Sequence, residues 1–553
     1  MADKILFVVN NVDYIDPMGV MLMSALAKRE GFATFLTVLS QDDLGEELKR
    51  IKPDIVAHCS VKTGEQQFFL KANDKIKDYS KSIVTIMGGP HPTFNPDIIE
   101  ESLIDAVGMG ECDVAWPKLL KALRDREDTS NIPNIFTRDS WLSKWKNETE
   151  ANRNRFRHKL THPLDGLPFY DREIVYSKTH LGKFPMRCFM SSWGCPFECT
   201  YCFEPKTNAQ QRGLGPIYRR YSPRRLCAEL KELKNRYSTQ FIKFYDDMFV
   251  LSRSVDPWLA EFAEIYPQEV GLPFFCLTRC NVLTRENLTV LKKAGLHSIT
   301  MSIESGNDYI REKVIKRHMT RPEIEEAFAL CNEMGVKTFA NSILAIPVKK
   351  EIMAEQDKTP IDYDFDSLEL NLKSRVTFGE FSPVYPYPGC ELSEYVVENG
   401  WFDYTDFGKL HASYQNESPL NCFTPLEKRM QSNMSLLGTV FLAFPFLYSR
   451  KFAEFLFKLP LAKLYFILYF FVKGYLNVFK IYPMKFSVVS LLLNIRRSIA
   501  LEYKKHAPGE RIYESKRTMS QATTPMLGGL PQGGLIPPPP KPKKKDDIFK
   551  IID

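Results

Sequence analysis

The sequence predicts an α/β protein: a doubly wound, flavodoxin-like N-terminal domain, then a partial (β/α)6 barrel of the TIM type, then an α-helical C-terminal region. Three observations predict it. Apolar runs alternate with amphipathic helix patterns near the N-terminus, the alternation resumes in the middle of the chain, and a strongly apolar stretch follows. A chain of 553 residues is too long for one core. We expect a first domain at 1–140, a linker at 141–184, a barrel at 185–400, a helical, apolar and basic region at 401–510 and a disordered tail at 511–553.

Composition describes a globular protein, with 44% hydrophobic and 25% charged residues. The first residues, MADKILFVVNN, contain only a short apolar run and predict neither a signal peptide nor a membrane span. We therefore expect a cytoplasmic protein. In a reducing compartment most of the 12 cysteines are expected to be buried small hydrophobes, and only a tight cluster indicates metal or redox chemistry.

In the first domain the expected strands are KILFVV, DIVAHCSV, SIVTIMGG and DAVGMG, separated by helix-like segments such as QQFFLKANDKIKDYS. Continuous apolar strands alternating with amphipathic helices predict a parallel sheet covered on both faces. Ligands of such sheets bind beyond the carboxyl ends of the strands. Here those ends are residues 10–19, 60–64, 88–93 and 108–111. The turn after the first strand, NNVDYIDPMG, lacks the G-x-G-x-x-G pattern, which disfavours a dinucleotide.

The expected barrel strands are RCFMSSWG, FIKFYDDMFVL, FFCLTRCNVL, HSITMSIESG, VKTFANSILAI and RVTFGEFSPVY. Polar side chains recur where they end: three cysteines, then Asp246 with Asp247, Arg279 and Glu304. The strands of a barrel deliver such residues to one shared mouth. The aspartate pair is equally well explained as a helix cap.

The cysteines are Cys195, Cys199 and Cys202, spaced C-x-x-x-C-x-x-C. Structural zinc normally takes four ligands, and Cys188 is the only other cysteine close in sequence. Three thiolates can instead hold three irons of a [4Fe-4S] cluster and leave the fourth iron open.

This cluster, with Tyr201 before its last cysteine, resembles the signature of radical S-adenosylmethionine (SAM) enzymes. The resemblance extends over KFYDDMF, LTRCN, SIESGNDYIREKVIKRHMT and PYPGCEL in family order. It implies that SAM binds the open iron and is cleaved to a 5′-deoxyadenosyl radical. It also implies that the backbone of Tyr201 contacts adenine, and that Arg279, Ser302 and Glu304 position the amino-acid and ribose parts. The family's glycine-proline after the fifth strand is replaced by LAIPV, which puts that contact in doubt.

The first domain is similar to the cobalamin-binding domain found ahead of many radical enzymes, through DPMGVMLMSALAKREG, PDIVAHCSVKTG, GGPHPT and DAVGMGECDVAW. The family's D-x-H-x-x-G loop has Asp16 where its cobalt-binding histidine would stand, which implies cobalamin without a histidine ligand. His58 stays open as a contact, although a lone histidine is more often structural. The implied cobalamin contacts are Asp16, Gly19, Ser60, Thr63, Gly88, Gly89, His91, Gly108, Gly110 and Glu111.

Together the two resemblances imply a cobalamin-dependent radical SAM enzyme, similar to members that act on tetrapyrroles and isoprenoid lipids. The implied reaction methylates an unactivated carbon through methylcobalamin and needs a flavodoxin- or ferredoxin-type reducing partner. Oxidative cyclisation or another rearrangement without methyl transfer, as in the anaerobic cyclase of chlorophyll synthesis, stays open. So does a non-catalytic cobalamin sensor, which a complete cysteine trio disfavours. No residue is singled out as the catalytic group.

Residues 433–500 carry nine of the basic residues against the single acid Glu454, so the net charge of +7 is local and does not indicate a nucleic-acid partner. No uninterrupted apolar run there reaches the ~18 residues of a spanning helix, since Lys463 and Lys473 interrupt the longest. Two interpretations stay open: a helix lying in the membrane interface, and a helical domain packed on the barrel. Beyond about residue 510, a proline-, glycine- and lysine-rich composition predicts disorder.

Overall fold

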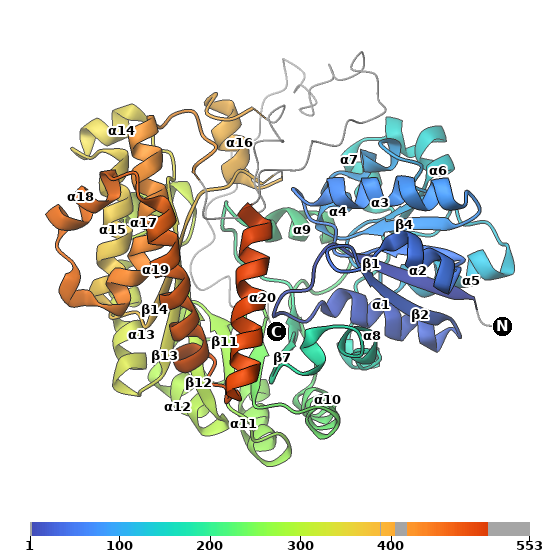
Figure 1. Cartoon of the computed structure of the whole chain (residues 1–553), viewed down its shortest axis with the longest axis horizontal. Coiled ribbons are helices and arrows are strands. Elements are labelled where there is room, and N and C mark those ends of the chain that lie inside the picture. Colours follow the sequence, from blue (N-terminus) through green and yellow to red (C-terminus); the bar gives the residue numbers. More distant parts are fainter. Residues whose placement is uncertain (1–2, 388, 404–416, 507–553) are drawn as a thin grey trace.

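The structure, a computed structural model, describes residues 3–387, 389–403 and 417–506. Two α/β units lie side by side, the first domain on the right of Figure 1 and the barrel on the left. The C-terminal helices cover the barrel on the side away from the first domain, apart from the last helix, which lies between the two units. The expected tail at 511–553 lies outside the described residues.

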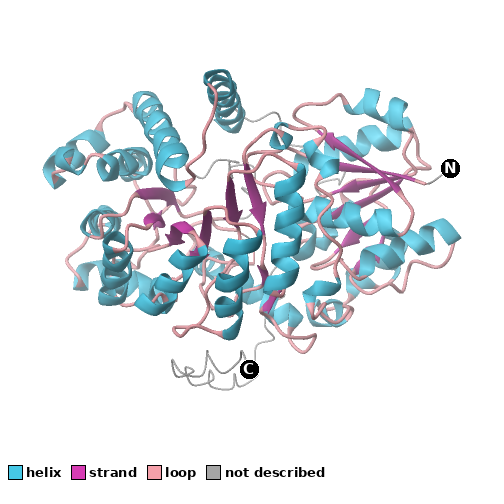
Figure 2. Cartoon of the chain, turned by 90° about the horizontal axis from the view of Figure 1, so that it is seen from below, coloured by secondary structure: helices cyan, strands magenta, loops and turns pink. Residues whose placement is uncertain are grey.

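The first domain is a six-stranded sheet in the order β2-β1-β3-β4-β5-β6, in which β1 to β5 are parallel and β6 is antiparallel. Helices lie on both of its faces (Figure 2). The strands are β1 (Lys4–Val9), β2 (Ala33–Val38), β3 (Ile55–His58), β4 (Val84–Gly88), β5 (Ala106–Gly108) and β6 (Ile135–Thr137). The helices are α1 (Met18–Arg29), α2 (Leu44–Ile51), α3 (Gln66–Tyr79), α4 (Pro90–Phe94) and α5 (Ala115–Asp125).

The doubly wound class is confirmed, and the four expected strands are β1, β3, β4 and β5. Two strands were not expected. β2 lies at an edge of the sheet, so the first half of ATFLTV is only partly buried and its apolar run is weak. β6 has three residues and pairs antiparallel at the other edge. Edge strands bury less surface and therefore leave a fainter pattern in the sequence.

Short helices join the two units: α6 (Arg138–Ser143), α7 (Glu150–Arg155) and α8 (Glu173–Tyr176). Directly before α8, Arg172 ties the units together. Its guanidinium forms a 3.1 Å ion pair with Asp16 and donates to the carbonyl of Cys188 at 2.9 Å. The second oxygen of Asp16 accepts from no partner among the described residues, while its first also accepts from the amide of Cys188.

The barrel is a six-stranded sheet, parallel throughout, in the order β14-β13-β12-β11-β10-β7. Each strand lies beside the previous one, and no pairing between β7 and β14 closes the sheet, so the barrel is a half-barrel. The strands are β7 (Met186–Phe189), β10 (Phe241–Phe244), β11 (Phe274–Thr278), β12 (Leu296–Met301), β13 (Lys337–Leu344) and β14 (Phe378–Pro383), which confirm the six expected runs. The helices are α9 (Glu204–Gln211), α10 (Pro223–Arg236), α11 (Pro257–Glu269), α12 (Arg285–Ala294), α13 (Arg321–Glu333), α14 (Lys350–Glu355), α15 (Pro360–Lys373) and α16 (Glu391–Glu398).

The C-terminal region is helical, as expected. Its helices are α17 (Pro425–Ala443), α18 (Arg450–Lys458), α19 (Ala462–Tyr475), which continues as a π-helical turn over Leu476–Ile481, and α20 (Val488–His506). α17 packs on β14, where Thr439 donates to the carbonyl of Gly379 at 2.7 Å. A side chain at Gly438 would come within 2.7 Å of the Phe381 ring, so glycine permits this close approach.

The segment after α19 fills the concave face of the half-barrel at the amino ends of its strands. Along β10, Phe244 packs against α11 on the outer side, so Phe241, three residues earlier, points to the inner side. There Tyr482 contacts the rings of Phe241 and Phe275, and Ser298 donates to the carbonyl of Ile481 at 2.6 Å. The C-terminal region therefore supplies part of the barrel core.

Candidate active site

The three cysteines lie in the loop that follows β7, at the carboxyl end of the half-barrel. Two residue pairs hold the start of this loop, because β8 (Ser192–Trp193) pairs antiparallel with β9 (Arg219–Arg220). Gly194 has a φ of +85°, and a Cβ there would meet the carbonyl oxygen of Ile217 at 2.3 Å. The turn that leads to the first cysteine therefore requires glycine.

Asp246 anchors the same loop from the end of β10. Its buried carboxylate accepts from the hydroxyls of Ser191 and Ser192, at 2.8 Å and 2.7 Å, and from the amide of Ser192. Burial raises the pKa of Asp246 to about 7. In this structure Asp246 caps no helix; it positions the cysteine loop.

Cys195, Cys199 and Cys202 line one apolar cluster together with Phe197 and Met248. Burial raises the pKa of the Cys195 thiol to about 12 and that of Cys202 well above its ordinary value. Within the described ranges, no three cysteine, histidine or carboxylate side chains are grouped closely enough for a single metal ion. Three thiols on one apolar wall suit an iron–sulfur cluster, whose thiolates bind separate irons, better than they suit zinc.

Two buried arginines lie against the middle cysteine. Arg279 follows β11 and donates to Sγ of Cys199 at 3.3 Å, while Arg317 donates to the same sulfur at 3.8 Å. Arg279 also lies over the Phe197 ring, 4.0 Å from its centre. Positive charge at this position stabilises a thiolate and any anionic group bound beside it.

Arg317 was not among the residues expected to bind SAM. It donates to the hydroxyl of Tyr201 at 3.0 Å and to the carbonyl of Ser302 at 3.0 Å, and the Tyr201 hydroxyl donates to Glu304 at 2.9 Å. Of the four residues expected for SAM, Arg279 contacts Cys199 directly, and Arg317 links the other three, Tyr201, Ser302 and Glu304, to the same cysteine. The sequence contained a signal for this residue. Arg317 lies in the segment KRHMT, which follows the SIESG motif that contains Glu304.

Glu304 sits in a loop whose shape is set by its neighbours. It has a φ of +62°, and its amide donates to the carbonyl of Asn341 on β13 at 3.0 Å. Burial raises the pKa of Glu304, while Arg317 opposes the rise. A residue other than glycine with a positive φ has a strained backbone. Such strain persists only where the surrounding structure holds it.

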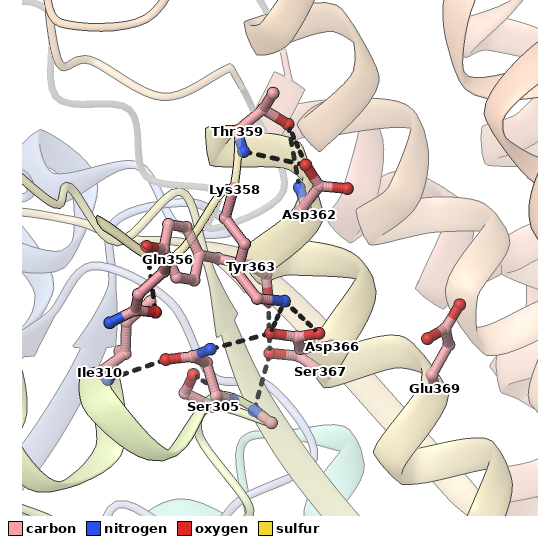
Figure 3. Close-up of polar contacts among 12 residues, drawn as sticks. Ser305, Ile310, Gln356, Lys358, Thr359, Asp362, Tyr363, Asp366, Ser367 and Glu369 are labelled. Atoms are coloured by element: carbon pink, nitrogen blue, oxygen red, sulfur yellow. Dashed lines mark hydrogen bonds and ion pairs between the residues drawn. The ribbon is translucent and has the colours of Figure 1, made fainter. Parts of the chain in front are cut away.

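Helix α15 supplies that support (Figure 3). The amide of Gly306 donates to the Ser367 hydroxyl at 3.0 Å, and Asn307 donates to the carboxylate of Asp366 at 2.9 Å. Lys358 also forms an ion pair with the Asp366 carboxylate, at 2.8 Å. A Cβ on Gly306 would lie 2.0 Å from the Asp366 carbonyl oxygen, so the loop packs against α15 only as glycine.

The first domain presents small, connected loops at the carboxyl edge of its sheet. Thr63 and His91 are hydrogen-bonded at 3.0 Å, and the amide of Gly110 donates to Thr93 at 2.9 Å. Gly89 has a φ of +128° and approaches the amide of Val61, to which a Cβ would come within 2.4 Å. Burial lowers the pKa of His91 to about 4, which keeps the imidazole neutral.

Two of the glycines at this edge have open space beside them, whereas a third is closely packed. A Cβ on Gly88 would meet no atom within 4 Å, and one on Gly19 would reach only the Ser60 hydroxyl, at 3.9 Å. A Cβ on Gly108 would come within 2.9 Å of the Cys112 sulfur. The expected cobalamin contacts Gly19, Ser60, Thr63, Gly88, Gly89, His91, Gly108 and Gly110 lie at this one edge of the sheet, and the open space beside Gly19 and Gly88 is compatible with a bound group.

Two residues of the expected cobalamin set serve the contact between the units. Asp16 is bound to Arg172 and to the Cys188 amide, and Glu111 pairs with Arg219 of β9, with an Nη1–Oε2 distance of 3.0 Å. His58 lies in the interior, 3.4 Å from the side chain of Asn73. All three side chains make contacts within the protein that sequence position alone could not reveal, although Oδ1 of Asp16 and Nδ1 of His58 have no partner among the described residues.

The edge of the first sheet faces the cysteine loop. Phe94 of α4 contacts the ring of Phe203, the residue after Cys202, at 6.4 Å between centres. The Glu111–Arg219 ion pair spans the same contact. The carboxyl ends of both sheets, where each unit would bind its cofactor, therefore meet at one interface.

Comparison with known proteins agrees with both halves of this site. Residues 191–356 match the model of the radical SAM superfamily, and residues 6–120 match the B12 binding domain. An uncharacterized methyltransferase of Pyrococcus horikoshii is 24% identical over 70% of this chain and 81% of its own length. The hopanoid C-3 methylase of Methylococcus capsulatus is 24% identical over 68% of each chain. The anaerobic magnesium-protoporphyrin IX monomethyl ester cyclase of Rubrivivax gelatinosus is 22% identical over 63% of this chain and 62% of its own length.

Among solved structures, the radical SAM methyltransferase TsrM of Kitasatospora setae, with cobalamin and a [4Fe-4S] cluster bound, superposes with a TM-score of 0.55. It is 17% identical and covers 72% of this chain and 78% of its own. The likeness shows a shared fold. The matches and the site together define a radical SAM enzyme with a B12-binding domain.

The chain belongs to the cobalamin-dependent radical SAM enzymes, a family that contains methyltransferases. Its cofactors are a [4Fe-4S] cluster, SAM and cobalamin. The sensor interpretation is set aside by this membership and by the complete cysteine set.

Proposed function

We propose that this radical SAM enzyme methylates an unactivated carbon of a lipophilic, isoprenoid or tetrapyrrole-like substrate. One observation carries the proposal: the carboxyl ends of the two sheets meet, with Phe94 against Phe203 and Glu111 paired with Arg219. A substrate held at that interface would lie between the two cofactors. Relatives named as a hopanoid methylase and a bacteriochlorophyllide methyltransferase support the substrate class.

When bound, the cluster supplies an electron to the SAM sulfonium, and cobalamin supplies the methyl group. The residues of the chain bind and orient SAM. Arg279 and Arg317 hold the carboxylate end of SAM, since two guanidiniums converge there. Glu304 accepts hydrogen bonds from its ammonium or ribose groups. Burial of both arginines excludes water from this contact and strengthens it.

The cleavage consumes an electron, so we propose a flavodoxin- or ferredoxin-type donor. We also propose that the enzyme works in the cytoplasm, against the inner face of a membrane that holds its substrate. The exposed apolar side chains of the C-terminal helices support this location.

Product analysis with SAM carrying an isotopically labelled methyl group tests the proposal. Anaerobically reconstituted enzyme, a chemical reductant and candidate lipids should give a product that carries the label. Formation of 5′-deoxyadenosine with a changed but unlabelled product would instead establish cyclisation or another rearrangement, the second candidate, which the cyclase relatives favour. Absence of 5′-deoxyadenosine from enzyme with an intact cluster would contradict both.

A further inference from the structure

The C-terminal helices expose a large apolar face. More than half of the exposed large hydrophobic side chains among the described residues fall between positions 444 and 499. The most exposed, Phe446, is 82% accessible. Soluble monomers rarely leave so much contiguous apolar surface uncovered unless it has a partner.

One helix shows how this face is oriented. Along α19, Leu464, Leu468, Phe471 and Tyr475 are exposed at helical spacing, whereas the other side of the helix packs on the barrel. On the packed side Tyr469 donates to Glu380 of β14 at 3.1 Å, and a Lys473–Glu380 ion pair lies beside it.

These contacts decide between two ways of meeting a membrane. The stretch Ala462–Ile481 is long and apolar enough to cross a bilayer by length and composition, with a mean hydropathy of 1.4. Crossing would break the Lys473–Glu380 pair and withdraw Ile481 from the barrel core, where it is fully buried. The ion pair is partly buried and is supported by the Tyr469–Glu380 hydrogen bond, and Ile481 is fully buried, so these contacts hold the helix flat on the barrel.

The charge around the face is predominantly positive, and the acid Glu454 is paired with Lys458. Lys451, Lys463, Lys485 and Arg496 are exposed, and within the described ranges none of them is paired with a carboxylate. Basic side chains at the rim of an apolar, aromatic face are the combination that binds the surface of an anionic bilayer. A second copy of the chain would bring the same positive charges together at its own interface.

We propose that the exposed face of α18, α19 and α20, with the preceding loop around Phe446, docks in the interface of an anionic lipid bilayer. α20 lies between the barrel and the first domain (Figure 1), and the Tyr14 hydroxyl of the first domain donates to the Asn494 carbonyl at 3.0 Å. Docking therefore brings the lipid against the junction of the two units. This role for the junction rests on the proposed lipophilic substrate, whereas docking itself does not.

Flotation of the full chain with vesicles tests docking. Vesicles of phosphatidylcholine with 30% phosphatidylglycerol, about a physiological anionic fraction, should carry the protein upward, and pure phosphatidylcholine should carry much less. The double variant Phe446→Ser/Phe471→Ser should weaken binding about tenfold or more, because two aromatic side chains no longer enter the interface. Lys451→Gln/Lys463→Gln should weaken it about fivefold for each charge removed, and only with anionic lipid.

Matched variants on the first domain control for altered folding. Leu103→Ser/Leu142→Ser removes two exposed apolar side chains, and Lys81→Gln/Lys121→Gln removes two exposed charges. Both should float like the unchanged protein. Flotation that is equal in all variants, or that ignores anionic lipid, would overturn the proposal. So would self-association that the phenylalanine variants abolish while no vesicle binding occurs.

The assay also separates docking from catalysis. Formation of 5′-deoxyadenosine measured in detergent-free buffer reports the radical chemistry and should be unchanged in the docking variants. Loss of flotation with normal cleavage would leave the reaction class intact, and normal flotation with no labelled product would overturn only the substrate proposal.

Discussion

The carboxylate of Asp16 lies 3.1 Å from the guanidinium of Arg172, and both side chains are almost completely buried between the two units. One partner belongs to the loop after β1 and the other to the segment before the half-barrel. The pair fixes how the first domain meets the barrel, and with it the separation of the two cofactor faces. Asp16, at the position where the D-x-H-x-x-G loop of some cobalamin domains has a histidine, therefore contacts the second unit in this structure.

Replacing Arg172 by methionine should destabilise the protein by on the order of 3 kcal/mol, because Asp16 would remain buried without its partner. Urea unfolding measures this. The double variant Arg172→Met/Asp16→Asn should recover part of the loss, since no charge is then left unpaired. Equal stability of the single variant and the unchanged protein would refute the locking role.

Replacing Cys199 by alanine should abolish formation of 5′-deoxyadenosine and the visible absorption of the reconstituted cluster. Cobalamin binding should persist, because Cys199 lies in the barrel and one face of the first sheet packs in a core of its own. Chromatography of the nucleoside product and a cobalamin titration measure the two effects. Cys227→Ala, in α10, is the matched control and should retain both activities. Continued cleavage by the Cys199 variant would exclude the cluster assignment.

Replacing Arg317 by glutamine should raise the KM for SAM about tenfold or more, because a charge-assisted hydrogen bond contributes about 1.5–3 kcal/mol. Cluster absorption should stay unchanged, which separates a binding role from a structural one. Arg317→Lys keeps the positive charge and should restore part of the affinity. If the KM stays constant while cluster content falls, Arg317 acts on the cysteine loop instead.

Replacing Gly306 by alanine should lower SAM cleavage and cost on the order of 2 kcal/mol of stability, because the new methyl group collides with the backbone of Asp366. Thermal unfolding and product formation measure the two effects. Gly474→Ala is the control, since its Cβ would meet no atom within 4 Å and it lies in a helix, where alanine is favoured. Normal activity in Gly306→Ala would show that the loop tolerates displacement from α15.

The buried Asp246 predicts a pH dependence of stability. Its pKa is about 7 in the folded protein against an ordinary 3.8, so the folded state keeps its proton while the unfolded chain loses it. Its contribution is therefore full below pH ~4 and is lost as the pH rises to ~7, by up to about 1.4 kcal/mol per pH unit. Asp246→Asn keeps an oxygen acceptor for Ser192 and should flatten this window in urea unfolding. If the unfolding free energy of Asp246→Asn depended on pH in the same way as that of the unchanged protein, Asp246 would not be the titrating group.

The sequence predicts the fold well because the fold depends on local pattern. Continuous apolar strands such as those of β11 and β12 carry their own signature, and the spacing of Cys195, Cys199 and Cys202 is itself the motif. The two edge strands β2 and β6 lack that strength of pattern.

Sequence position fails where a role depends on a partner far along the chain. Sequence position places Asp16 and Glu111 at strand ends where a ligand is expected, but it does not show that they also form ion pairs with Arg172 and Arg219. Arg317 shows the reverse case. It lies 118 positions beyond Cys199, and only the folded half-barrel brings its guanidinium to that sulfur.

The segment around Tyr482 has a practical consequence for dissecting the enzyme. Because it completes the interior of the half-barrel, a shortened chain that ends before residue 476 would expose the rings of Phe241 and Phe275 to water. Truncation would then report misfolding rather than the loss of a separable module. Only point substitutions on the outer face can test the C-terminal helices without disturbing the catalytic half.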